Sequence, residues 1–142
     1  MIRKYRPADC EDVLSVWAQA SAVAHSFLSQ EFLVAERRNV RDAYLPNANT
    51  WIWEADGQAV GFISLLGNEI GGIFVDPKFQ RSGIGRALVD QVRALRGDIE
   101  VEVFEMNRLG RMFYAKLGFE FMYRKVHGNT GLHVLRLRLA TG

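Results

Sequence analysis

The middle of the chain constrains its fold most, because it contains three strand-like stretches in succession. Residues 51–55 and 60–66 flank Asp56-Gly57, a dipeptide typical of tight hairpins because glycine accepts the positive φ angle that such turns need. Gly67-Asn68 offers a second turn, after which residues 69–75 form a third expected strand. Hairpins join antiparallel neighbours, so this segment predicts an antiparallel sheet.

Helices and further strands are expected on both sides of these three strands. Residues 69–75 are linked to the alternating residues 99–103 by a strand–helix–strand crossover. The sheet is therefore predicted to be mixed, with helices on it, in the α/β or α+β class. The expected elements in chain order are a strand at 2–6, a helix after Asp9, a helix at about 30–45, the three strands, a helix from Ile84 to about Leu95, a strand at 99–103, a helix at 109–117, and a hairpin of 119–126 with 132–139.

Capping residues and apolar stripes support these helices. Asp9 is expected to cap the first helix, and Gly97 and Gly118 are expected to end the two later ones. The apolar faces expected to be buried consist of Ile84, Ala87, Leu88, Val92 and Leu95 in one helix, and of Leu109, Met112, Phe113 and Leu117 in the other.

Length and composition limit the classes of protein that this chain can belong to. One domain spanning residues 1–142 is expected, with the balance of apolar and charged residues found in soluble proteins. The net charge of +2 argues against nucleic acid as the main partner. Without an apolar run suited to a signal peptide or a membrane span, we expect a cytoplasmic protein with no membrane partner. A single cysteine, Cys10, excludes an internal disulfide and fits a reducing compartment.

The glycine-containing segment of residues 80–86 lies between an expected strand and an expected helix. Backbone N–H groups at a helix start have no internal partner and carry partial positive charge. Gly83 and Gly85 let an anion approach those groups, and Arg81 and Arg86 can add charge-assisted contacts. The segment therefore predicts a pyrophosphate cradle, the alternative being a simple turn before a helix.

Three phosphate-binding patterns compete for this segment. A Walker A loop ends in Gly-Lys-Ser/Thr, which the chain lacks. A dinucleotide fingerprint needs G-x-G-x-x-G directly after the first strand, whereas Gly83 and Gly85 are followed by Leu88 and come after the fourth strand. The third pattern, Gln/Arg-x-x-Gly-x-Gly/Ala, is matched in full by residues 80–85.

That pattern and a second motif resemble the GCN5-related N-acetyltransferases, the GNAT superfamily. The first motif follows "IFVDP", and "VFEMNRLGRMFYAKLGF" at residues 103–119 is similar to the family's C-terminal signature of a strand, Asn, Phe-Tyr and Lys-Leu-Gly-Phe. The resemblance covers nearly the whole chain and implies the GNAT fold, which has the element order given above. Trp17, the run His25-Ser26-Phe27-Leu28 and the short C-terminal hairpin resemble a group of small bacterial GNATs with poorly defined substrates.

The resemblance implies transfer of an acetyl group from acetyl-CoA, as co-substrate, to an amine by direct attack. The amides of residues 81–86 would hold the pyrophosphate, and the backbone of residues 73–75 would pair with the pantetheine arm. Gly71-Gly72 would suit a bulge beside the thioester, where an N–H could polarise the acetyl carbonyl. Asn107 would meet the pantetheine, cap the following helix, or do both. The residues implied for donor binding are Ile73, Phe74, Val75, Arg81, Ser82, Gly83, Ile84, Gly85, Arg86 and Asn107.

Tyr114 matches the family's general acid. The leaving thiolate needs a proton, since thiols have a pKa of about 8.5, and a phenol of pKa about 10 stays protonated at neutral pH. The alternative is a core tyrosine on an amphipathic helix. Phe113 fits the apolar stripe better than Tyr114, so the catalytic interpretation is favoured.

Glu69 and His25 are the candidate bases for the amine. Glu69 begins the strand at 69–75, where several family members have a base, although a carboxylate serves well only with burial or a relaying water. The alternative for Glu69 is an exposed turn residue. His25 ends the first helix near the expected acceptor mouth, and histidine suits proton transfer at neutral pH; its alternative is a plain helix-end residue. Trp17 and Phe27 would line the acceptor pocket or belong to the core.

Other functions on the same fold compete with this interpretation. Propionyl-CoA or succinyl-CoA would replace acetyl-CoA if the pocket beside Gly71 and Gly72 were wide enough. A non-catalytic CoA-binding or protein-interaction module is a second alternative, against which Tyr114 and Asn107 argue. A third is a toxin-type acetyltransferase acting on aminoacyl-tRNA, which would need a basic patch. The candidate arginines for such a patch are Arg37, Arg38, Arg41, Arg136 and Arg138.

The residues leave several properties undetermined. The acceptor is an amine of a small molecule or a peptide, and the chain is a monomer or a homodimer. No pair of histidine or cysteine residues has metal-ligand spacing, so no metal is predicted. Glu100 and Glu102 alternate with apolar residues and are expected to face solvent.

Overall fold

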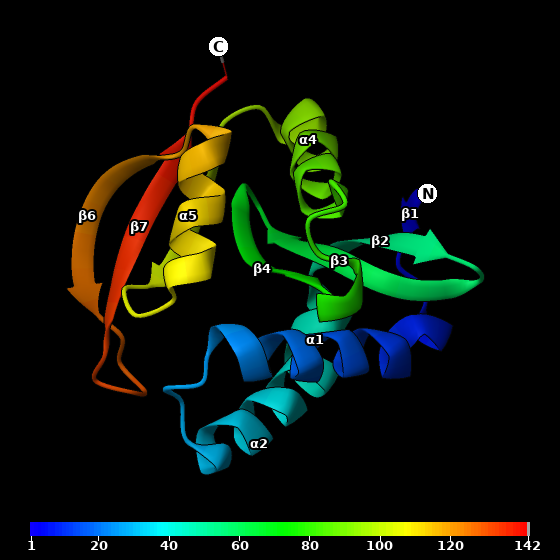
Figure 1. Ribbon diagram of the computed structural model, residues 1–142, viewed down its shortest axis with the longest axis horizontal. Helices are drawn as coiled ribbons and strands as arrows, with labels where there is room; N and C mark the ends of the chain where they lie inside the picture. Colours follow the sequence, from blue (N-terminus) through cyan, green and yellow to red (C-terminus); the bar gives the residue numbers. More distant parts are fainter. Residues whose placement is uncertain (142) are drawn as a thin grey trace.

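The computed structural model describes residues 1–141 as a seven-stranded mixed sheet with helices packed on it (Figure 1). The predicted order of strands and helices is confirmed, and 3₁₀ turns at Pro7–Asp9 and Pro77–Phe79 are added to it. The elements are β1 (Ile2–Lys4), α1 (Cys10–Ala24), α2 (Gln30–Asn39), α3 (Leu45–Asn47), β2 (Asn49–Ala55), β3 (Gln58–Leu66), β4 (Glu69–Val75), α4 (Ile84–Arg96), β5 (Ile99–Phe104), α5 (Arg108–Leu117), β6 (Glu120–Val126) and β7 (His133–Leu139).

The strands follow the order β1-β2-β3-β4-β5-β7-β6 across the sheet. Strands β4 and β5, which α4 connects, run parallel, and the other neighbours run antiparallel; among these, β2–β3, β3–β4 and β6–β7 are hairpins. Figure 1 shows α1 and α2 on one side of β2–β4, α4 on the opposite side, and α5 beside β7. The parallel pair therefore lies in the middle of the sheet, with helices on both of its faces.

The β2–β3 hairpin has the turn that its sequence predicts. Asp56 and Gly57 have φ angles of +53° and +78°, and Ala55 pairs with Gln58 across the turn. Two positive φ angles match the right-handed twist of the flanking strands, which is why Asp-Gly is favoured there.

The helix expected at residues 30–45 is interrupted in the structure. Helix α2 ends at Asn39, and a π-helical turn, Val40–Tyr44, connects it to α3. The Leu45 N–H donates to the Val40 carbonyl across this wider turn, and the Leu45 side chain is buried. The extra residue per turn rotates Tyr44 toward the sheet, a local change that apolar spacing does not reveal.

Two cores lie on opposite faces of the sheet. The larger core contains the inner faces of α4 and α5 with strands β3, β5 and β7, and includes Leu88, Val92 and Leu137. The smaller core joins α1 and α3 to β2 and β3 through residues such as Val13 and Ile52. Burial of these apolar stripes fixes both helical layers against the sheet.

Three residues of the expected apolar faces are exposed instead. Leu95, Leu109 and Met112 have exposed fractions of 52%, 52% and 51%. Leu109 and Met112 lie at the margin of the α5 stripe, away from the buried Tyr114, and Leu95 lies in the last turn of α4, which ends at Arg96. Within residues 1–141, the helices fall short of the length and hydropathy that a membrane span requires.

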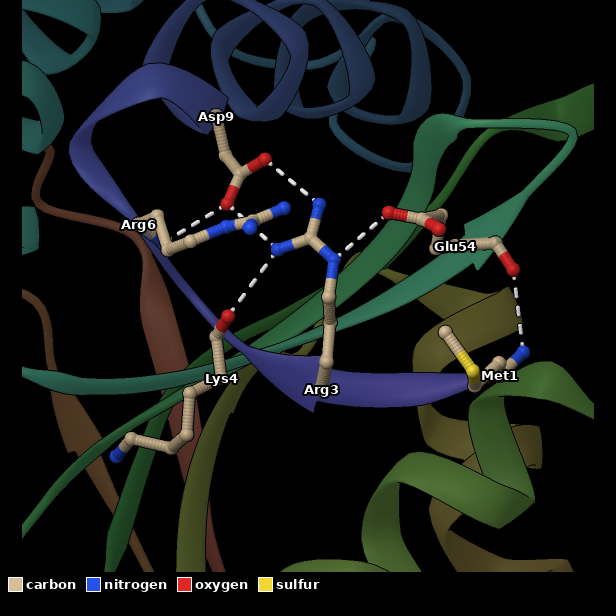
Figure 2. A network of polar contacts seen from close by, with 6 residues as sticks. All are labelled: Met1, Arg3, Lys4, Arg6, Asp9 and Glu54. Atoms are coloured by element: carbon tan, nitrogen blue, oxygen red, sulfur yellow. Dashed lines mark hydrogen bonds and ion pairs between the residues drawn. The ribbon is translucent and has the colours of Figure 1, made fainter.

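The Asp9 side chain binds the N-terminal strand rather than capping α1. Arg3 donates to both carboxylate oxygens of Asp9 at 2.8 Å and to Glu54 at 2.7 Å, and the Arg6 N–H donates to Asp9 (Figure 2). Asp9 takes the expected N-cap position of α1, but its side chain makes no capping hydrogen bond to that helix, because the bidentate arginine uses the carboxylate. These bonds lower the pKa of Asp9 and fasten β1 to the start of α1.

Candidate active site

Strands β4 and β5 separate soon after they begin, which leaves one edge of β4 unpaired. Their register pairs Glu69 with Glu100 and Ile70 with Val101, although β4 has 7 residues. On its other side, β4 stays paired with β3 along its length. Residues 71–75 therefore present backbone N–H and C=O groups toward the gap, where an extended ligand can pair as an added strand does.

The Gly71-Gly72 pair forms the predicted bulge. Ile70 and Gly72 lie opposite consecutive residues of β3, so Gly71 is the extra residue. As a consequence, Ile70 and Ile73 both pack into the larger core although they are three residues apart. The two glycines between them face the other side of the sheet, toward α1 and the π-helical turn.

The loop between β4 and α4 places backbone amides at the end of the free β4 edge. Gly83 and Arg81 have φ angles of +86° and +65°, in the left-handed region that residues other than glycine rarely adopt. The Ala87 N–H donates to the Gly83 carbonyl at 3.0 Å as the helix begins. The amides of residues 84–86 precede that bond, so they have no helical partner and suit an anion.

Side chains fasten this loop to the strand before it. Gln80 Nε2 donates to the Val75 carbonyl at 3.1 Å, which joins the loop to the last residue of β4. Ser82 Oγ donates to the Phe79 carbonyl. The predicted cradle and the free edge of β4 are thus one continuous surface.

The two glycines of the predicted cradle, Gly83 and Gly85, are required for different structural reasons. A Cβ on Gly83 would have no heavy atom within 4 Å, so its φ angle alone requires glycine and the space above it is open. A Cβ on Gly85 would lie 3.0 Å from the Phe113 ring, so that glycine also lets α5 pack on α4. Arg81 and Arg86 are exposed, and neither forms an ion pair within residues 1–141.

Tyr114 lies on the face of α5 that packs into the larger core. It is 7% exposed, and its ring contacts Phe113 and Phe119 with centroids 5.3 and 5.2 Å away. The prediction that Phe113 fits the buried stripe better was wrong, because Phe113 is only partly buried. Burial raises the pKa of Tyr114 well above that of a free phenol, so the hydroxyl keeps its proton.

Asn107 caps α5 and also contacts His25. Its Oδ1 accepts the Gly110 N–H at 2.9 Å, as expected of a cap. Its Nδ2 lies 3.4 Å from His25 Nε2, and the residue is buried. The contact joins the end of α1 to the start of α5 across the gap between β4 and β5.

His25 lies in an aromatic cluster at the end of α1. Its ring makes edge-on contacts with Phe27, Phe74 and Phe104, with centroids 5.8, 6.3 and 5.5 Å away. Burial lowers the pKa of His25 to about 4, so the imidazole is neutral at physiological pH. A neutral ring can accept the Asn107 hydrogen bond, but it is a weak base toward an ammonium ion.

A cavity of about 370 Å³ brings several predicted residues together. Its lining includes His25, Glu69, Gly71-Gly72, Phe74 and the predicted pocket residue Trp17, whereas Tyr114 and Asn107 are not part of it. Trp17 also belongs to the smaller core, so both interpretations of it hold. Three carboxylates line the cavity, and no lysine or arginine does; the carboxylates are Glu36, Glu69 and Glu102.

Arg136 connects the cavity to the paired ends of β4 and β5, next to the point where the two strands separate. Its guanidinium lies 3.2 Å from Glu69, 2.8 Å from Glu100 and 3.4 Å from Glu102. Glu100 and Glu102 lie on the face opposite the buried residues of β5, as expected, but they are only partly exposed, because Arg136 lies opposite Glu102 on β7 and also reaches Glu100. No group of His, Cys, Asp and Glu side chains arranged to hold a metal occurs in the described residues, and the absence of a metal stays a prediction.

Most arginines of the considered basic patch have acidic partners. Besides Arg136, ion pairs join Arg138 to Asp98, Arg41 to Asp42 and Arg37 to Glu11. Their charge is compensated within the chain, which weakens the argument for a polyanionic partner.

Sequence reasoning overlooked two residues of this region. Tyr44 lines the cavity because of the π-helical turn, for which the sequence offers no clear signal. Arg136 was noted only for its charge. Alternating acids in residues 99–103 and alternating arginines in residues 132–139 would have indicated paired strands, if the register had been known.

Comparison with known proteins identifies relatives of the whole chain. A family model described as an acetyltransferase (GNAT) domain matches residues 46–121. The chain is 34% identical over 123 residues to the peptidyl-lysine N-acetyltransferase YiaC of Escherichia coli strain K12, covering 86% of this chain and 84% of that protein. The solution structure of apo YjaB from Escherichia coli superposes with a TM-score of 0.85 at 30% identity, covering 99% of this chain and 96% of that chain.

A more distant structure supports the same fold. The PaiA N-acetyltransferase of Thermoplasma acidophilum, solved in complex with coenzyme A, has a TM-score of 0.78 at 18% identity and covers 96% of this chain. The family model covers more than half of the chain, and YiaC is more than 30% identical over most of both proteins. The chain therefore belongs to the GNAT family of acetyltransferases.

Proposed function

We propose that this enzyme transfers the acetyl group of acetyl-CoA to the side-chain amine of a peptidyl lysine. The observation that supports this most is a continuous path through the structure. It starts at the amides of residues 84–86, follows the free edge of β4, and ends in a cavity lined by carboxylates. Along this path, the amides can bind an anion, the strand edge can pair with an extended arm, and the carboxylates can attract a cationic acceptor.

The donor side of the proposal uses mainly backbone groups. The amides of residues 81–86 would hold the pyrophosphate, with Arg81 and Arg86 adding charge-assisted contacts. Residues 73–75 would pair with the pantetheine arm along the unpaired edge. Bound acetyl-CoA supplies an activated thioester carbonyl, and an N–H of the Gly71-Gly72 bulge would polarise it. The PaiA complex with coenzyme A supports a donor site on this fold.

The chemical step forms a bond between the amine nitrogen and the acetyl carbon and breaks the carbon–sulfur bond. Tyr114 would donate its hydroxyl proton to the departing thiolate. Burial keeps the phenol protonated but also makes it a weaker acid, so the transfer needs direct contact between the hydroxyl and the sulfur. Asn107, at the start of the same helix, would contact the pantetheine with the amide end that the cap does not use.

The amine proton would leave through Glu69, with a water as relay. Glu69 lines the cavity at the start of β4, and Arg136 at 3.2 Å compensates its charge and fixes its position. His25, which also lines the cavity, is the second proposed proton acceptor. We rank it behind Glu69 because burial makes the ring a weak base and because its Nε2 already faces Asn107 Nδ2 at 3.4 Å.

The acceptor side favours a cationic amine. Glu36, Glu69 and Glu102 line the cavity, so an approaching ammonium group meets carboxylate oxygens. Arg136 pairs with Glu69 and Glu102, and Lys125 pairs with Glu102, whereas Glu36 has no ion-pair partner within residues 1–141. A second cavity, of about 430 Å³ between α1 and α2, shares Trp17 and His25 with the first, leaving room for peptide beyond the amine. The relative YiaC is a peptidyl-lysine N-acetyltransferase, which fits this acceptor class. A free Cys10 agrees with the reducing cytoplasm as the place of action.

Acetyl transfer to a defined peptide tests this function. The acceptor is a peptide with a blocked N-terminus and one lysine, and its control has alanine in place of that lysine. We expect mass spectrometry to show one acetyl group on the first peptide and none on the second. Binding of acetyl-CoA without transfer to any amine would favour the non-catalytic module, and transfer only to aminoacyl-tRNA would favour the toxin-type activity.

A further inference from the structure

Aromatic side chains cover the two glycines of the β4 bulge on the face that lines the cavity. A Cβ built on Gly71 would lie 1.3 Å from the Tyr44 hydroxyl oxygen and 2.2 Å from Cζ of the same ring. A Cβ built on Gly72 would lie 2.9 Å from Cε2 of Phe74. Real Cβ atoms do not approach so closely, so aromatic atoms already fill the space of both missing side chains.

Both aromatic groups are walls of the cavity. Tyr44 and Phe74 line it together with the two glycines that they cover. Phe74 is held in place by Phe62, with ring centroids 5.5 Å apart, and by His25 at 6.3 Å. The width of the cavity beside the bulge is therefore set by these two rings.

Tyr44 is positioned by packing and not by its hydroxyl. It ends the π-helical turn, and the next residue, Leu45, anchors the chain in the smaller core. The hydroxyl is shielded from solvent and, within residues 1–141, has no hydrogen-bond partner. Burial and the charge of Glu69 raise the pKa of Tyr44 to about 12, so the side chain is uncharged.

We propose that Tyr44 limits the transferred acyl group to the size of acetyl. This inference rests on the proposed function, which places the thioester beside Gly71 and Gly72. A propionyl group adds a methylene that would need space occupied by the Tyr44 ring, and overfilling a packed site is unfavourable. A succinyl group would also bring a carboxylate toward Glu69, so like charges would oppose it.

The test compares acyl donors in three proteins. We would measure kcat/KM with acetyl-CoA, propionyl-CoA and succinyl-CoA for the unaltered enzyme, Tyr44→Ala and Tyr44→Phe, and Kd for each donor without an acceptor. The unaltered enzyme should prefer acetyl-CoA to propionyl-CoA by about tenfold or more. Tyr44→Ala should reduce that preference by about tenfold, whereas Tyr44→Phe, which keeps the ring, should leave it within about twofold. In Tyr44→Ala, kcat/KM for succinyl-CoA should rise less than kcat/KM for propionyl-CoA, because the negative charge of Glu69 remains.

Each failure has a separate meaning. An unchanged preference in Tyr44→Ala, with free CoA bound as tightly as before, would overturn the role of Tyr44. Equal use of acetyl and propionyl donors by the unaltered enzyme would overturn the size limit alone. Failure of the unaltered enzyme to bind any acyl-CoA would overturn the proposed function itself. If Tyr44→Ala does not fold, Tyr44→Leu takes its place with the same direction of change.

A reciprocal substitution tests the contact independently of activity. Gly71→Ala should lower the melting temperature when Tyr44 is present, because the new Cβ overlaps the phenol. The same change should have little effect in the Tyr44→Ala background. Additive effects of the two substitutions would contradict the contact, since residues that touch are expected to be coupled.

Discussion

The donor side and the acceptor side of the gap between β4 and β5 are built from different groups. The donor side consists mainly of backbone: the free edge of β4 and the loop before α4, shaped by local features such as Gly83. The acceptor side consists of side chains from distant segments, including Trp17, Glu36 and Glu102. Substitutions should therefore separate donor binding from acceptor use, because the two sides share few atoms.

The largest expected effect is on chemistry and not on binding. Tyr114→Phe should lower kcat by about 10²- to 10⁴-fold, because the thiolate then leaves without a proton donor. The Kd for acetyl-CoA, measured by calorimetry, should stay within about twofold, since the ring still fills the core. The control is Tyr123→Phe on β6, where the side chain is 45% exposed and both quantities should be unaffected. An unchanged kcat in Tyr114→Phe would remove Tyr114 from the acid role.

The next effect should fall on donor binding. Gly83→Asp should weaken acetyl-CoA binding by about 10- to 100-fold, because it places a carboxylate where phosphate is expected. Gly131→Asp is the matched control, since Gly131 also has a positive φ of +73° and no neighbour within 4 Å of its Cβ. It should cause similar backbone strain and no loss of affinity. Equal losses in both variants would mean that strain, and not the cradle, explains the result.

A third effect concerns the acceptor side. Arg136→Met leaves Glu69, Glu100 and Glu102 close together without their shared counter-charge, so the free energy of unfolding should fall by about 3 kcal/mol. KM for the lysine peptide should rise because Glu69 loses the contact that fixes its position, while acetyl-CoA affinity of the folded protein persists. Arg138→Met is the control: its ion pair with Asp98 is half exposed, so the loss should stay below about 1 kcal/mol in urea unfolding. Equal losses of unfolding free energy in Arg136→Met and Arg138→Met would contradict a special role for Arg136.

The smallest effect concerns the attachment of α1, which contributes Trp17 to the cavity. The folded-state pKa of Asp9 lies below its usual 3.8, chiefly through hydrogen bonds from Arg3. That stabilisation is present above about pH 4 and is lost as the pH falls toward the lowered pKa. Arg3→Met should therefore cost about 1 kcal/mol at pH 7 and progressively less in acid. Thermal unfolding of both proteins from pH 7 to pH 3 measures how this cost depends on pH. A loss of stability that is the same at every pH would indicate lost packing instead.

Much of the fold could be predicted because its signals are local. The Asp56-Gly57 turn, the bulge at Gly71-Gly72 and the glycine that ends α5 each reflect a backbone angle or a close approach that few residues tolerate. The π-helical turn before Leu45 and the exposure of Leu109 could not be predicted, because packing against other segments decides them. The same reason explains why Tyr114, and not Phe113, is the buried aromatic residue of α5.

By itself, the sequence determined the family resemblance, the element order and the segment of residues 80–86 as a candidate for anion binding. These depend on neighbouring residues, whose backbone preferences act over a few positions. Only the tertiary structure decided that Arg136 bridges three glutamates, that His25 is half-buried and neutral, and that Tyr44 fills the space above Gly71. Such contacts join residues far apart in the chain, and their existence depends on strand register and helix packing that no local pattern specifies.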